Sequence, residues 1–263
     1  MSAPGPGRDA LSSRLEAAGC IAPDEEADEL MEAAGGDQDL LGRLAARRVA
    51  GEPLAWVIGS VNFAGCRVRV QPGVYVPRWQ TEALVHRAIE LLPPQGMAAD
   101  LCTGSGAIAM ALARARPGAR VVGSEVDPLA CACAAGNGIE VYPGDLAEPL
   151  PLELWGHFDV VIAVVPYVPS DMVAYLPREV REYEPCLALD GGPGGTRVLE
   201  QAVWAGATLL REGGTLLLEL GGDQDQALKD VLIAAGFGAV RTHVDEDGDL
   251  RGIEARLERR RAQ

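Results

Sequence analysis

The stretch Asp100–Ala113, DLCTGSGAIAMALA, has residue types and a spacing that suit the binding of a nucleoside-like ligand. A short apolar run leads into a turn with glycines at 104 and 106, and an alanine-rich segment typical of a helix follows. Glycines let the backbone approach a ligand closely, and such a turn delivers the ligand to a helix N-terminus. The turn is not a phosphate-binding loop, because no Gly-Lys-Ser/Thr follows, and Ala109 stands where a dinucleotide motif has its third glycine.

Two further acids follow at the spacing that an adenosine site requires. Glu125 ends the run RVVGSE, about 20 residues on, where a carboxylate can accept both hydroxyls of a ribose. Asp145 in YPGDL follows the next apolar run, where an acid can meet an adenine amino group. Taken singly, Asp145 is equally a turn residue and Asp127 a helix cap. Together, and without a pyrophosphate-type glycine pattern, these residues favour S-adenosylmethionine, with Asp100 facing its amino-acid end.

The elements that must position these acids alternate between strand and helix from about residue 78 onward. Such alternation implies right-handed crossovers and a parallel sheet covered by helices on both faces. Carboxyl ends of neighbouring parallel strands then share one crevice, which brings the acids together. Strands are predicted at 97–102, 119–126, 139–146, 158–165 and 213–221, and helices at 81–92, 103–118, 127–138, 195–213 and 225–236.

The chain before residue 78 has a different pattern. Residues 1–7 are predicted to be disordered, and three short helical segments follow up to about residue 50, each ending at glycine. The stretch IGSVNFAGCRVRVQPGVYVP alternates around Phe63–Val70 and contains a Pro72–Gly73 turn, which predicts a connecting β-hairpin. We therefore divide the chain into a helical domain (1–58), a hairpin linker (59–77) and a sheet domain (78–263).

Composition narrows the class of partner. The net charge of −15 argues against a nucleic-acid partner, which needs a basic face. The six cysteines and three histidines are scattered without metal-ligand spacing, so we expect no metal site. No signal segment and no apolar run near the ~20 residues that cross a bilayer is present, so we expect a cytoplasmic protein without a membrane partner.

The chain resembles a known family, the HemK-type (PrmC-like) protein-glutamine N5-methyltransferases, which modify release factors. The order and spacing agree along nearly the whole length. The resemblance implies an α/β class I Rossmann-like S-adenosylmethionine-dependent methyltransferase: a seven-stranded, mostly parallel sheet with a final antiparallel strand, behind a small N-terminal helical domain. The matching stretches are LAARRVAGEPLAWVIGSVNFAG, VQPGVYVPRWQTEALV, ADLCTGSGAIAMALA, GDLAEPLP, FDVVIAVVPYVP and REYEPCLALDGGPGGTRVLEQ.

The resemblance also implies which residues line the site, and three of its motifs differ in this chain. The family's Asn-Pro-Pro-Tyr is Val164 to Tyr167 here, its PRPETE is PRWQTE (77–82), and its DLGTGSG is DLCTGSG. The change at Cys102 leaves both loop glycines in place, so we expect cofactor binding to survive, with S-adenosylhomocysteine as the product. The residues implied to line the cofactor site are Asp100, Thr103, Gly104, Gly106, Glu125, Val126, Asp145, Leu146 and Val164.

The change at Val164 falls on the methyl acceptor. In the family, the asparagine and a neighbouring backbone carbonyl both bond the glutamine amide. Valine offers neither donor nor acceptor, and each polar group left unpaired costs roughly 1–3 kcal/mol. The carbonyl of Val165 can remain, and Tyr167 can still wall the pocket. We therefore favour a small cationic acceptor, a guanidino or amino compound such as free arginine, held by nearby carboxylates.

The candidate acceptor residues follow from that hypothesis, each with a local alternative. Trp79 can stack on a cation or pack at a boundary, and Arg78 can hold a substrate carboxylate or an internal ion pair. Asp171, Glu179 and Glu182 can equally be a solvated face. The predicted catalytic residues are Val165, Pro166, Tyr167 and Glu184, and the predicted substrate residues are Arg78, Trp79, Glu82, Val164, Tyr167, Glu182 and Glu184.

Two alternatives remain open. The chain can keep a protein glutamine as acceptor, with backbone groups compensating for the lost asparagine, or it can bind the cofactor without catalysis. An adenine methyltransferase acting on nucleic acid is disfavoured, because the asparagine is lost and no basic region is present. The N-terminal helices can cap a smaller pocket or form a homodimer contact.

Overall fold

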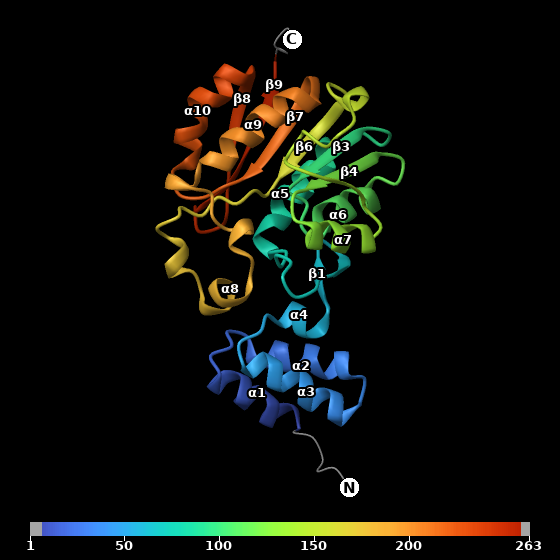
Figure 1. Cartoon of the computed structure of the whole chain (residues 1–263), viewed down its shortest axis with the longest axis vertical. Helices are drawn as coiled ribbons and strands as arrows, with labels where there is room; N and C mark the ends of the chain where they lie inside the picture. Colours follow the sequence, from blue (N-terminus) through green and yellow to red (C-terminus); the bar gives the residue numbers. More distant parts are fainter. Residues whose placement is uncertain (1–6, 259–263) are drawn as a thin grey trace.

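The computed structural model describes residues 7–258, so the prediction of disorder for residues 1–6 lies outside the described residues. Figure 1 shows an elongated molecule with a helical bundle at one end, a small hairpin in the middle and a helix-covered sheet at the other end. Gly35 ends the second helix in the left-handed conformation, and Asp37 caps the third by accepting from the Leu40 amide. The bundle consists of α1 (Arg8–Ala17), α2 (Pro23–Ala34), α3 (Gln38–Val49) and α4 (Leu54–Ile58).

The predicted hairpin is present, but its turn lies elsewhere. Strands β1 (Ser60–Phe63) and β2 (Cys66–Arg69) pair antiparallel around Ala64–Gly65, both with positive φ. Two-residue turns with positive φ match the twist of the paired strands, so this turn closes the hairpin and Pro72–Gly73 lies beyond it. The division of the chain at residues 58 and 77 stays a prediction.

The predicted sheet architecture is confirmed. Seven strands lie in the order β5-β4-β3-β6-β7-β9-β8, and among the described residues β9 alone runs in the direction opposite to the other six. The sequence pattern had not predicted a strand at the positions of β8 and β9. The strands are β3 (Met97–Leu101), β4 (Arg120–Glu125), β5 (Glu140–Pro143), β6 (Phe158–Ala163), β7 (Leu210–Glu219), β8 (Phe237–Val244) and β9 (Leu250–Leu257).

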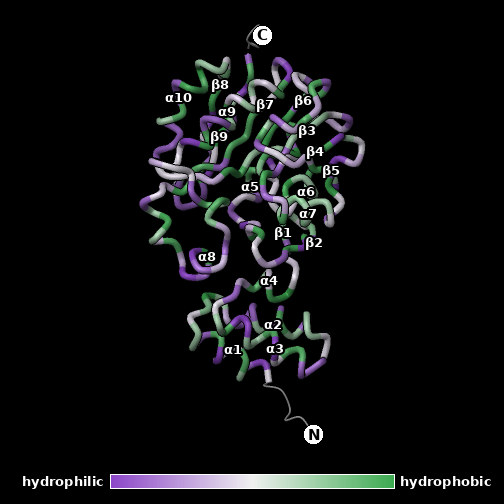
Figure 2. Tube along the Cα trace, viewed as in Figure 1, coloured by the Kyte–Doolittle hydropathy of each residue, from purple (hydrophilic) through white to green (hydrophobic). Residues whose placement is uncertain are grey.

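Helices cover both faces, which explains why the central strands read as unbroken apolar runs. Val160 and Ile162 pack on the side of α5–α7, whereas Val161 and Ala163 pack on the side of α9 and α10. Figure 2 shows the same concentration of apolar residues along the strands. The covering helices are α5 (Glu82–Leu91), α6 (Ala107–Ala115), α7 (Pro128–Gly136), α9 (Arg197–Leu209) and α10 (Gln224–Ala235).

The segment between β6 and α9 reaches toward the helical bundle (Figure 1). It contains α8 (Arg178–Tyr183), whose Glu179 pairs with buried Arg48 of α3 at 2.6 Å. The Tyr183 hydroxyl donates to the carbonyl of Ala50 at 3.1 Å. The bundle therefore holds the segment that returns to the sheet. Within residues 7–258, none of the helices has the length and apolar character needed to cross a membrane.

Candidate functional site

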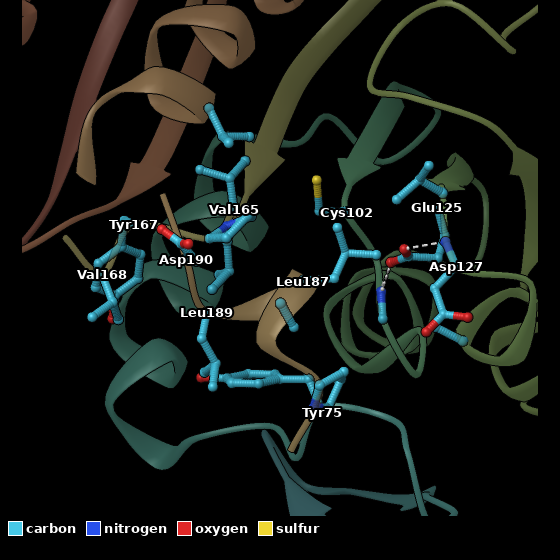
Figure 3. A pocket seen from close by; sticks show the side chains of 18 of the residues that line it. Tyr75, Cys102, Glu125, Asp127, Val165, Tyr167, Val168, Leu187, Leu189 and Asp190 are labelled. Carbon is cyan, nitrogen blue, oxygen red and sulfur yellow. Dashed lines mark hydrogen bonds between the residues drawn. The ribbon is translucent and has the colours of Figure 1, made fainter. Parts of the chain in front are cut away.

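A cavity of about 280 Å³ opens at the carboxyl ends of β3, β4, β5 and β6 (Figure 3). Glu125 and Asp127 lie on one side of it, and the apolar end of β6 lies on the other, together with Asp190. This is where ligands bind in open α/β sheets. Its lining includes Tyr75, Cys102, Gly104, Glu125, Val126, Asp127, Asp145, Val164–Val168, Pro185, Leu187–Asp190, Arg197 and Gln201.

The two glycines of the β3–α6 turn have different roles. Both have positive φ, but a Cβ at Gly104 would meet nothing within 4 Å, whereas one at Gly106 would lie 2.8 Å from Ile139 Cγ1. Gly104 therefore leaves room at the cavity for a ligand. Gly106 lets the start of α6 pack closely against the α7 side, and it does not belong to the lining of the cavity.

Asp100 lies beneath the turn rather than in the cavity wall. It is completely buried, and its Oδ2 accepts from Thr103 Oγ1 at 2.5 Å and from the Ala109 amide at 3.1 Å. Burial raises the pKa of Asp100 to about 7, against the effect of those two hydrogen bonds. Its Oδ1 is buried and has no partner within the described part of the chain. A ligand ammonium group would supply the missing donor.

Glu125 ends β4 and lines the large cavity; its contact with a ribose stays a prediction. Its Oε2 accepts from the Gly104 amide at 2.8 Å, and its Oε1 accepts from the Asp127 amide at 2.9 Å (Figure 3). Burial raises the pKa of Glu125, whereas the backbone amides lower it. Each carboxylate oxygen keeps a lone pair for a ligand hydroxyl.

The predicted cofactor residues separate into those that line the site and those that support it. Asp145 and half-exposed Val126 both line the large cavity, and the contact of Asp145 with an adenine stays a prediction. Leu146 is buried and outside the lining, and Thr103 lines a smaller neighbouring cavity. With the open Gly104, the unpartnered Asp100 oxygen and the acids of β4 and β5, the site fits S-adenosylmethionine. That group supplies an electrophilic methyl on a sulfonium.

Cys102 introduces a side chain where the resemblance expects glycine. Its φ is +56°, a conformation that costs a non-glycine residue on the order of 1 kcal/mol. Its side chain lines both cavities, and burial raises the pKa of the thiol well above its usual value. The thiol therefore acts as a small apolar group that narrows the site, and retained cofactor binding stays a prediction.

The end of β6 forms the other side of the site. Val164 lines both the large cavity and the neighbouring one of about 50 Å³, and Val165 is 1% exposed. Tyr75 also lines both cavities, and sequence reasoning missed it because a lone aromatic in a loop carries no pattern. The side chains around the smaller cavity include the cation Arg78 and no carboxylate.

The predicted acceptor residue Glu184 faces Arg78 instead of a cavity. Its side chain is fully buried, and one oxygen accepts from the Arg78 guanidinium while the other accepts from the Val76 amide at 3.5 Å. Burial raises the pKa of Glu184, whereas Arg78 lowers it. The Arg78 guanidinium also lies over the Tyr75 ring, 5.1 Å from its centroid. The pair is a structural element of the site wall, the local alternative considered for Arg78.

The other acids offered for a cationic acceptor are engaged or exposed elsewhere. Glu182 is on the surface and pairs with Arg178 at 2.9 Å, Glu179 pairs with Arg48, and Asp171 is exposed. The expected carboxylate cradle for a guanidinium is therefore absent from these residues. The preference for a small cationic acceptor loses its structural support.

Two further predicted substrate residues lie outside both cavities. Trp79 is 73% exposed, and Glu82 accepts from the Ala64 amide at 3.0 Å at the start of α5. Within residues 7–258 no group of three or more metal-ligating side chains is present.

Comparisons with known proteins agree with this geometry. No protein-family model matches the chain. It is 37% identical to the release factor glutamine methyltransferase of Geobacter sulfurreducens over 220 residues, which cover 81% of this chain and 76% of that protein. The protein of the same name from Moorella thermoacetica is 40% identical over 201 residues, or 72% of this chain and 69% of that protein.

Solved structures share the fold at lower identity. The Mtq2–Trm112 complex of E. cuniculi, responsible for methylation of the eRF1 termination factor, matches with a TM-score of 0.53 and 21% identity, covering 71% of this chain and 99% of that one. The ribosomal protein L11 methylase of Lactobacillus delbrueckii matches with a TM-score of 0.52 and 18% identity, covering 73% and 86%. The sequence relatives are closer and cover most of both chains. The chain therefore belongs to the release factor glutamine methyltransferase family, S-adenosylmethionine-dependent enzymes with a Rossmann-like sheet.

Proposed function

We propose that this protein transfers the methyl group of S-adenosylmethionine to the side-chain amide nitrogen of a glutamine in a protein acceptor, such as a release factor. The observation that carries the proposal is the wall around Val164. The smaller cavity beside it contains no carboxylate, and Glu184 is neutralised by Arg78. A neutral amide suits this smaller cavity, whereas a guanidinium placed in it would lose its hydration without an anionic partner. The names of the relatives favour the same acceptor.

The reaction depends on the alignment of the amide nitrogen with the methyl group rather than on a strong acid or base among the side chains. The amide nitrogen forms a bond to the methyl carbon as the carbon–sulfur bond breaks, and the nitrogen loses a proton to solvent. The carbonyl of Val165 accepts no backbone hydrogen bond in the loops of residues 7–258, so it is available to an acceptor amide. Holding the nitrogen in line with the methyl supplies most of the rate enhancement.

Val164 makes this site weaker than one with asparagine. The amide loses one side-chain partner, at roughly 1–3 kcal/mol. We therefore expect a higher KM or a lower kcat for glutamine than in relatives that keep the asparagine.

The test is methylation with labelled S-adenosylmethionine. The purified protein is incubated with release factors of its own organism, with the same factors carrying alanine at the methylated glutamine, and with free arginine. We expect label in the intact factor alone. Label in arginine alone would overturn the proposal, and cofactor binding without label in any acceptor would favour the non-catalytic alternative.

A further inference from the structure

Glu219 is a buried carboxylate that the site described above does not use. It ends β7, is 6% exposed and forms no ion pair within residues 7–258. Its Oε1 accepts from the Tyr167 hydroxyl at 3.0 Å, and its Oε2 accepts from Thr81 Oγ1 at 2.5 Å. Burying a carboxylate without a cation costs free energy, so the role of this group and of its two hydroxyl partners needs an explanation.

The carboxylate joins two walls of the site that are distant in sequence. Thr81 precedes α5 and lines the smaller cavity, whereas Tyr167 follows β6 and lines the large one. The partners lie 138 and 52 residues from Glu219 along the chain. Each of these residues lines a cavity that Val164 also lines, so the carboxylate connects the two cavities on either side of Val164.

The main chain of Tyr167 is held separately. Gln224 Nε2 donates to the Tyr167 carbonyl at 2.8 Å and to the Gly194 carbonyl at 3.2 Å. A Cβ at Gly195 would lie 2.0 Å from the Tyr167 carbonyl oxygen, so the two backbones are in close contact. With the main chain fixed, the orientation of the phenol ring is what the carboxylate controls.

We infer that Glu219 is a positioning residue for methyl transfer, because it holds the Tyr167 ring in place beside the acceptor nitrogen. The inference deepens the proposed function and rests on it for the identity of the acceptor. An ionised carboxylate can accept from both hydroxyls at once, and hydrogen bonds to charged groups are about twice as strong as neutral ones. A glutamine has one acceptor oxygen and an amide group that donates, so one of the two hydroxyls would have to accept instead of donate, and neither bond would involve a charge. Burial raises the pKa of Glu219, whereas the Thr81 and Tyr167 hydroxyls lower it.

The kinetic test is a double-mutant cycle. Glu219→Gln removes the charge and one of the two acceptor oxygens, Tyr167→Phe removes the donor hydroxyl, and both keep the shape; we expect each to lower kcat by about 10- to 100-fold. The affinity for S-adenosylhomocysteine should change by less than about threefold, because the cofactor acids are untouched. The kcat of the double variant should lie within about threefold of that of the less active single variant, because both substitutions disrupt the same interaction. Additive losses would overturn the inference.

A matched control distinguishes positioning from general stabilisation. Asp159 is a half-buried carboxylate with two partners, the Met97 amide at 2.8 Å and Arg211 Nε at 2.7 Å, at the opposite end of β6. Asp159→Asn should lower the melting temperature without lowering kcat below the melting transition. A fall in kcat equal to that of Glu219→Gln would count against a specific role.

A second readout needs no acceptor, so it separates this inference from the proposed function. The five tyrosines are labelled as 3-fluorotyrosine, and the fluorine resonance of Tyr167 is identified by its absence in Tyr167→Phe. We expect Glu219→Gln to shift or broaden that resonance and Asp159→Asn to leave it unchanged. An unmoved resonance would refute the positioning role. A moved resonance together with unmethylated glutamine would refute only the proposed acceptor.

Discussion

The two sides of the site are built in different ways. The cofactor wall (the β3–α6 turn with Glu125 and Asp145) is local: Thr103 bonds Asp100 across three positions, and Gly104 bonds Glu125 across 21. The acceptor wall (Tyr75, Arg78, Thr81, Val164, Tyr167, Glu184 and Glu219) depends on long-range pairs. Arg78 meets Glu184 across 106 positions, and Thr81 meets Glu219 across 138.

This difference indicates which side of the site can change its specificity. The cofactor wall uses backbone amides and two glycine conformations, which tolerate little variation. The acceptor wall uses side chains from separate elements, so one substitution there alters the acceptor and leaves the donor site unchanged. Val164 is one such position: its change weakens the hold on the glutamine amide, whereas the acids of β4 and β5 are unaffected.

The largest expected effect is on the acceptor wall. Arg78→Met leaves the Glu184 carboxylate buried without its cation, and we expect a loss of about 3 kcal/mol in the free energy of unfolding, measured in urea. The Arg78→Met, Glu184→Gln double variant should recover much of that loss, because no charge remains buried. A single variant as stable as the wild type would show that the pair does not hold this wall.

The next effect is on the cofactor wall. Glu125→Ala removes the ribose partner and leaves the Gly104 and Asp127 amides unpaired. We expect the Kd of S-adenosylhomocysteine, measured by calorimetry, to rise about 100-fold. Glu140→Ala is the control, because Glu140 is an exposed carboxylate on neighbouring β5 that pairs with Arg120. Equal affinities in the two variants would contradict the ribose assignment.

A smaller effect tests the departure at the end of β6. Val164→Asn restores an amide partner for the acceptor, and we expect kcat/KM for the protein glutamine to rise about tenfold. The affinity for S-adenosylhomocysteine should stay the same, which separates the two walls. If kcat/KM does not change, Val164 does not contact the acceptor.

The smallest effect is a pH dependence of donor binding. Asp100 has a pKa of about 7, so below that pH it must release a proton to bind the ligand ammonium. We expect the Kd of S-adenosylmethionine to rise as the pH falls from 7 to 5.5, by up to about tenfold. The ligand α-amino group, with a pKa of about 7.7–8, is charged throughout this range. The Asp100→Asn variant should bind S-adenosylmethionine weakly and with a Kd that does not depend on pH in this range. If the Kd of the variant and of the wild type depend on pH alike, another group is responsible.

Much of the fold and of the cofactor wall could be predicted from the sequence. The strand–helix alternation led to the parallel sheet, and the acids Glu125 and Asp145 were found because they end the two apolar runs that follow the glycine turn, at the spacing of an adenosine site. The turn at Ala64–Gly65 was missed, since Pro72–Gly73 is the stronger turn pattern. Glu219 was missed because one acid at the end of an apolar strand has no spacing that marks it.

The sequence by itself determined the family, the sheet and the cofactor, and it predicted where the donor site lies, because these depend on local patterns: apolar periodicity, glycines at fixed offsets and acids at strand ends. Only the tertiary structure decided which acids are free to meet an acceptor. Glu184 and Glu179 looked available until folding placed Arg78 and Arg48 against them. Whether a carboxylate is neutralised depends on partners that distant segments bring to it, and no local pattern records that.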